Sequence, residues 1–176
     1  MPAHGRIAPA LGAVLEGLKL AAREYGGAAE DAARRRWVAV GLVAALQAAL
    51  VAALSGYESA RPEDAEDPSR PERLGPVALL LRRARSQEYL NPPERLDLSG
   101  EAQRGIAAVI DARNDVLHAL GEGAELPGNA AFRSVLDAIR HACLAHPAFP
   151  ADGHGVLLAL IGDEISALEW AMGQAG

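Results

Sequence analysis

Three residues that could carry acid–base and phosphate chemistry stand close together in the segment IAAVIDARNDVLHAL, residues 106–120: Arg113, Asn114 and His118. If this segment is a helix, its apolar side chains converge on one side, and Arg113 falls near the centre of that side. Burying a guanidinium without a partner is costly. We therefore expect Arg113 either to pair with a carboxylate or to open into a cleft or a subunit interface.

His118 follows near the end of the same predicted helix. The negative end of the helix dipole favours its charged form, and a histidine that exchanges a proton near neutral pH suits acid–base chemistry. Asn114 and His118 share a face because they are four residues apart. Arg113 and His118 lie roughly 140° apart on an ideal helix. They would converge only if the arginine folds back or if two subunits contribute to one site.

Two other interpretations of these residues remain open. In the first, Arg113 is a structural residue that forms an ion pair with an acid of another helix, such as Glu164 or Glu169. In the second, a helix face supplies oxygen and imidazole ligands for a divalent metal. The residues concerned are Asp111, Asp115 and His118, with His141 or His146 as a further ligand. We favour a site without metal or cofactor, and no serine or cysteine stands beside a histidine as a nucleophile would.

The elements that position these residues are expected to be helices. Half of the 176 residues are hydrophobic and only 4% are aromatic, and alanine and leucine dominate the apolar set, which favours helices over strands. The spacing of apolar residues predicts an all-α fold, a bundle of five or six helices in a single domain over residues 1–176. The helices are expected at residues 7–25, 31–57, 76–90, 100–120, 130–145 and 153–172. Ser99 and Asn129 are predicted N-caps, and Gly121 a C-cap.

Two segments stand apart from this pattern. Residues 58–73 carry prolines and many acids, and we predict a long solvated loop there. Residues 37–54, WVAVGLVAALQAALVAAL, form an apolar run of marginal length for a membrane span. Alanine dominates this run and Gln47 interrupts it, so we interpret it as the central helix of a bundle that does not enter a membrane.

Net charge and cysteine content limit the classes of partner and the cellular compartment that we expect. The net charge is −6, so any nucleic-acid site would need a local basic patch. The two arginine clusters, residues 34–36 and residues 82, 83 and 85, are interpreted as solvated helix faces. Cys143 is the single cysteine, which excludes an internal disulfide and fits a reducing cytosol. The N-terminal segment lacks the pattern of a signal peptide, and we expect a cytoplasmic protein.

The segment RNDVLH, residues 113–118, resembles the signature of HEPN domains, in which an arginine is followed by a polar residue and then by a histidine four to six residues after the arginine. HEPN domains are small all-α bundles. The wider segment from LLLRRARSQEYL to IAAVIDARNDVLHAL also resembles a group of poorly characterised bacterial helical proteins with RN and H on one helix. The resemblance covers about residues 35–145.

The resemblance implies a homodimer in which two such helices face each other, and in active members it implies metal-independent RNA cleavage. By this likeness His118 would act as acid or base toward the ribose 2′-hydroxyl or the leaving oxygen, Arg113 would stabilise charge on the phosphate, and Asn114 would orient the site. The expected role is RNA binding or cleavage in stress response or phage defence, with a neutralising partner protein as a further expected partner. Two alternatives stay open: a non-catalytic interaction or scaffold protein, and a helical domain that binds a nucleotide or small molecule.

Overall fold

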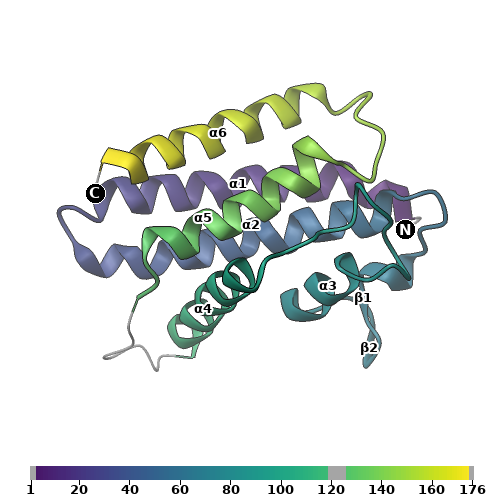
Figure 1. The fold of residues 1–176 in the computed structure, drawn as a ribbon, viewed down its shortest axis with the longest axis horizontal. Coiled ribbons are helices and arrows are strands. Elements are labelled where there is room, and N and C mark those ends of the chain that lie inside the picture. Colours follow the sequence, from purple (N-terminus) through teal and green to yellow (C-terminus); the bar gives the residue numbers. More distant parts are fainter. Residues whose placement is uncertain (1–2, 119–125, 175–176) are drawn as a thin grey trace.

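The computed structural model describes residues 3–118 and 126–174. The described residues form six α-helices and one small hairpin, shown in Figure 1. The prediction of an all-α fold with five or six helices is confirmed. The helices are α1 (Ile7–Gly27), α2 (Arg35–Gly56), α3 (Val77–Ala84), α4 (Gly100–Leu117), α5 (Asn129–Arg140) and α6 (Gly155–Gln174).

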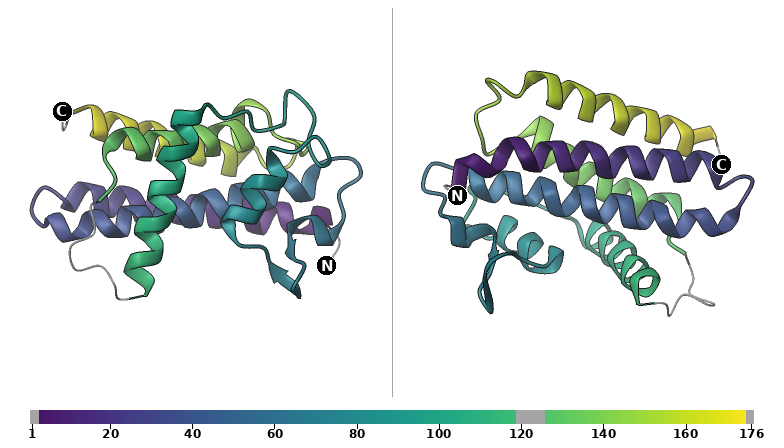
Figure 2. Two further views of the ribbon diagram at one scale, coloured as in Figure 1. Left: turned by 60° about the horizontal axis from the view of Figure 1, so that its bottom comes forward. Right: turned by 180° about the vertical axis from the view of Figure 1, so that it is seen from behind.

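Helix α2 lies at the centre of the bundle. It runs antiparallel to α1 and also contacts α3, α4 and α5, while α6 packs along α1 on the side away from α2 (Figures 1 and 2). The segment Ala32–Gly56 is long and apolar enough to cross a membrane by length and composition alone, yet 83% of its most apolar window is buried inside the protein. This is the position that we predicted for a central core helix, and it explains why the helix has no polar face.

Helices α1 and α2 approach most closely where two glycines face each other. A Cβ atom on Gly17 would lie 2.7 Å from the backbone nitrogen of Ala45, and one on Gly41 would lie 2.7 Å from the backbone oxygen of Gly17. Backbone therefore packs directly on backbone at this crossing. Larger residues around it, Leu18, Leu42 and Leu46, are fully buried and fill the core on either side.

The prediction of a solvated loop over residues 58–73 is only partly correct, because most of the segment is exposed but it is not a loop throughout. This stretch contains a 3₁₀ helix, Pro62–Ala65, and the antiparallel strands β1 (Glu66–Asp67) and β2 (Arg70–Leu74). Asp64 is buried and accepts hydrogen bonds from the Tyr57 hydroxyl (2.5 Å) and the Arg61 backbone N–H (2.7 Å). These bonds fix the fold of the segment although every residue of β2 remains exposed.

The predicted helix ends are only partly correct. Ser99 caps α4 as expected, since its hydroxyl accepts a hydrogen bond from the Ala102 N–H (3.1 Å). Asn129 does not cap α5, because Gly128 occupies the N-cap position and the Asn129 side chain is engaged elsewhere. Helix α3 ends at residue 84 rather than 90, and α5 continues into a π-helical turn, His141–Ala145. The predicted C-cap at Gly121 lies outside the described residues.

Candidate functional site

The first two-thirds of α4 is anchored in the core and its last turn is not. Ile106, Val109 and Ala112 are buried against α2 and α5, whereas Leu117 has 52% of its surface exposed. The left panel of Figure 2 shows why, because α4 crosses the bundle obliquely and its C-terminal end projects past α2. The apolar stripe predicted for this helix therefore ends before Leu117, and the motif residues lie where the helix leaves the core.

Arg113 is half-buried, and no carboxylate of the described residues lies within ion-pair distance of its guanidinium. Its Nη1 donates one hydrogen bond, to the side-chain oxygen of the adjacent Asn114 (3.0 Å). The alternative ion pair with Glu169 does not form, because that carboxylate accepts a hydrogen bond from Arg140 (2.6 Å). Glu164, the other acid considered, forms no ion pair within the described part of the chain.

His118 directly follows the last residue of α4 and is exposed to solvent. Its backbone N–H donates to the Asn114 carbonyl (3.0 Å) and so closes the last turn of the helix. Asn114 therefore contacts both other residues of the motif. Its side chain orients the Arg113 guanidinium, and its carbonyl fixes the backbone of His118. Within the described residues, the structure joins Arg113 to Asn114 through side chains, but no hydrogen bond links the side chains of Arg113 and His118.

This arrangement presents a cation and an imidazole on one accessible helix end. A guanidinium that uses one of its five N–H donors on Asn114 keeps donors that could bind a phosphate oxygen. An exposed imidazole is accessible to a ligand and has ring nitrogens that can donate or accept a hydrogen bond. The geometry thus offers charge stabilisation and proton transfer from residues within one helical turn and a half.

The metal arrangement considered from the sequence is not assembled. The described residues contain no group of three or more histidine, cysteine, aspartate or glutamate side chains placed to hold a metal ion. Asp111, Asp115 and His118 follow helical spacing, but His118 leaves the helix with φ −96° and ψ 10°. On the π-helical turn, the Nε2 atom of His141 lies 3.3 Å from the Glu94 carbonyl, and burial raises the pKa of the Cys143 thiol to about 12.

The prediction that the arginine clusters form solvated helix faces is only partly correct, since Arg82 and Arg85 are exposed whereas Arg34 and Arg83 are half-buried. Arg34 donates to Glu24 (2.9 Å), a carboxylate with only 7% of its residue surface exposed. Arg83 donates to the backbone oxygens of Asp64 (3.1 Å) and Glu66 (2.7 Å) and so holds the hairpin segment. Arg34 and Arg83 are therefore engaged within the molecule and are poorly placed to bind RNA.

Arg35 makes the most contacts of these arginines, and sequence reasoning missed its role because its partners lie on distant segments of the chain. Its guanidinium carbon lies 6.0 Å from the centre of the Tyr25 ring and 5.4 Å from that of Phe132. Its Nη2 donates to the Asn129 side-chain oxygen (2.7 Å), and the Asn129 amide nitrogen donates to the Met172 carbonyl (3.2 Å). This cluster connects α1, α2, α5 and α6, which makes Arg35 a structural arginine in the sense first considered for Arg113.

Comparison with known proteins adds no relative from which a role could be carried over. No family model matches the chain, and no curated protein or solved structure matches it. The functional argument therefore rests on the residues and on their geometry.

Proposed function

We propose that the protein is a HEPN-like, metal-independent ribonuclease or RNA-binding protein whose site is the C-terminal end of α4. Arg113 binds the phosphate, Asn114 orients the guanidinium, and His118 transfers the proton. The observation that supports this proposal best is the environment of Arg113. Its side chain is half-buried, no carboxylate of the described residues lies within ion-pair distance of it, and Asn114 holds its guanidinium in place. A structural arginine would show the contacts of Arg35 instead.

The proposed reaction needs no group beyond the RNA and these side chains. A ribose 2′-oxygen attacks the adjacent phosphorus, and the bond from phosphorus to the 5′-oxygen breaks. One imidazole in its neutral form takes the 2′-hydroxyl proton, and an imidazolium protonates the leaving 5′-oxygen. The guanidinium of Arg113 stabilises the extra negative charge on the phosphate during the attack. The products are a 2′,3′-cyclic phosphate and a 5′-hydroxyl end.

Because acid and base are both needed, two copies of His118 suit this reaction better than one. We propose a homodimer that forms through α4 and brings two motifs together. Leu117 supports this arrangement, because a leucine with 52% of its surface exposed stands directly beside His118. Ala107, also exposed on α4 and on the side of His118, would allow a second helix to approach closely.

The test uses the full chain, a pool of end-labelled RNA, and EDTA throughout. We expect chelator-resistant cleavage that leaves cyclic phosphate ends, with at least a hundredfold loss in Arg113→Ala and His118→Ala. Arg104→Ala is the matched control, because Arg104 is an exposed arginine on the same helix. RNA binding that is lost in Arg113→Ala but retained in His118→Ala, without cleavage, would assign the site to binding.

Two results would contradict the proposal. One is that neither cleavage nor binding is detected with the wild-type protein. The other is that Arg104→Ala and Arg113→Ala lower RNA affinity equally, which would mean that general positive charge is responsible. Marked destabilisation by Arg113→Ala alone would favour the structural role.

An interaction or scaffold role is the second candidate, and the outer face of α6 favours it. Val156 and Trp170 have 77% and 70% of their surface exposed, and Leu160 has 43%. A helix with large apolar residues on its solvent side is typical of a protein contact. Sedimentation velocity separates the two interfaces. Dissociation of a dimer by Leu117→Ser supports the α4 interface, whereas dissociation only by Val156→Ser with Trp170→Ser supports a contact through α6.

A further inference from the structure

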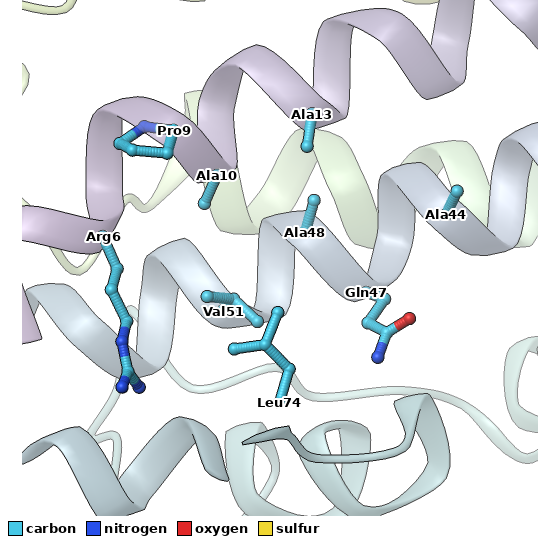
Figure 3. Close-up of a pocket in the computed structure, with 9 residues that line it drawn as sticks. All are labelled: Arg6, Pro9, Ala10, Ala13, Ala44, Gln47, Ala48, Val51 and Leu74. Carbon is cyan, nitrogen blue, oxygen red and sulfur yellow. The ribbon is translucent and has the colours of Figure 1, made fainter. Parts of the chain in front are cut away.

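A groove opens between α1, α2 and strand β2 (Figure 3). The right panel of Figure 2 shows this face of the helix pair, which no other helix of the described residues covers. Its volume is about 370 Å³, at the lower end of the range of small-molecule pockets. Nearly all its lining is apolar. The lining residues are Arg6, Pro9, Ala10, Ala13, Ala44, Gln47, Ala48, Val51 and Leu74.

The groove follows from the way in which α1 and α2 cross. The helices touch backbone to backbone at Gly17 and Gly41. Toward the start of α1 and the end of α2, alanines of both helices line the groove where larger side chains would fill it. Ala13 and Ala44 are exposed at its edge.

The two polar residues of the lining hold the hairpin in position and carry no free charge. Arg6 donates to the Pro62 carbonyl (2.9 Å) and forms an ion pair with Glu66. The Gln47 amide donates to the Gly75 carbonyl (2.9 Å). The Arg6 guanidinium holds the pKa of the Glu66 carboxyl below its usual range, so the pair remains intact and electrically neutral near neutral pH.

We propose that this groove binds the apolar chain of a neutral amphiphile, a flexible alkyl or acyl chain with an uncharged head group. The Arg6 guanidinium at the groove is already paired with Glu66. A ligand carboxylate would therefore lose its hydration without finding a free cation in the groove. The exposed Leu74 side chain at the edge, with 49% of its surface open, would be covered by such a chain.

The groove volume of about 370 Å³ and its apolar lining suit a slender apolar ligand. This site is independent of the motif on α4, because none of its lining residues belongs to that helix.

The experiment is a fluorescence titration of the full-length protein with the neutral apolar dye N-phenylnaphthylamine, followed by competition with decanol or decanoate below their micelle concentrations. We expect saturable binding of one dye per chain and displacement by decanol at concentrations at least tenfold lower than by decanoate. Equal or better displacement by decanoate would overturn the neutral ligand class. Absence of saturable binding would overturn the site itself.

Two variants locate the dye. Ala44→Phe and, separately, Ala13→Leu fill the groove from exposed positions and should weaken dye binding at least tenfold while leaving the thermal unfolding midpoint close to that of the wild type. Trp170→Ser removes part of the apolar face of α6 and should leave dye binding unchanged. Loss of binding in Trp170→Ser, with both groove variants unaffected, would place the dye on α6 and refute the proposal.

Discussion

Replacing Gly17 by alanine tests the crossing of α1 and α2 directly. The added methyl group would stand 2.7 Å from the backbone nitrogen of Ala45 and 2.8 Å from the carbonyl oxygen of Gly41. Ordinary contacts of a Cβ atom begin at 3.4 Å, so the two backbones must separate by about 0.7 Å (3.4 minus 2.7). Neither obstructing atom belongs to a flexible side chain, so a rotamer change cannot relieve the clash.

The magnitude follows from two opposing effects. Overpacking a well-packed core typically costs about 1–3 kcal/mol, and a clash between two backbones belongs at the upper end. Alanine is a better helix former than glycine by about 1 kcal/mol, which offsets part of that cost. We expect Gly17→Ala to lower the free energy of unfolding by about 2 kcal/mol. For a chain of this size, that is a fall in Tm of about 4–8 °C.

The matched control lies on the same helix. A Cβ atom on Gly12 would meet nothing within 4 Å, so Gly12→Ala gains helix propensity without a clash. It should raise the free energy of unfolding by up to about 1 kcal/mol. Urea unfolding followed by far-UV circular dichroism measures both variants, and their opposite signs isolate the packing effect from propensity.

The double variant adds a second check. Gly41 faces the same gap, so the helix separation caused by one alanine also makes room for the other. The cost of Gly17→Ala with Gly41→Ala should therefore be less than the sum of the single costs. If Gly17→Ala proves as stabilising as Gly12→Ala, the two helices do not pack backbone on backbone and the reasoning is refuted.

Three further predictions concern side chains whose contacts are described above. Arg35→Lys loses the planar contact with two aromatic rings and the short bond to Asn129, and should cost about 2 kcal/mol in urea unfolding; an unchanged midpoint would contradict the structural role. The pKa of Glu24 is lowered in the folded protein, chiefly by its hydrogen bond with Arg34, so the carboxylate stabilises the fold above its unfolded pKa and this stability is lost as pH falls through the folded pKa. The Tm difference between wild type and Glu24→Gln should therefore shrink below pH 4.5. A Tm difference that stays constant with pH would exclude the carboxylate as its source. The Cys143 thiol, buried and with its pKa raised to about 12, should react with a thiol reagent only upon unfolding, and fast labelling of the native protein would disprove its burial.

The sequence predicted the helices well because their cores repeat at helical spacing. Ile161, Ile165, Leu168 and Met172 mark the buried side of α6 in this way. The hairpin was not predicted because β2 is exposed along its whole length. Its sequence therefore lacks the alternation of apolar and polar residues that indicates a strand. Its conformation depends on tertiary hydrogen bonds, from Arg83 above all, that local sequence does not encode.

The proximity of the candidate site residues was predictable, but their surroundings were not. The pairing of Arg113 with Asn114 follows from their adjacency on one helix. Whether a carboxylate neutralises Arg113 depends on how α6 is placed, and the structure shows that Glu169 is taken by Arg140. The structural role of Arg35 was hidden for the same reason, because its partners come from helices far apart in the sequence.

The placement of α6 divides the molecule into parts that open at different free energies. This helix rests mainly on α1, with a smaller contact to α5, whereas α2 is enclosed by four helices. Detaching α6 uncovers one row of aliphatic side chains, but freeing α2 requires the loss of the entire core. Hydrogen exchange at the amides of α6 should therefore proceed through subglobal opening, while the amides of α2 exchange only through complete unfolding.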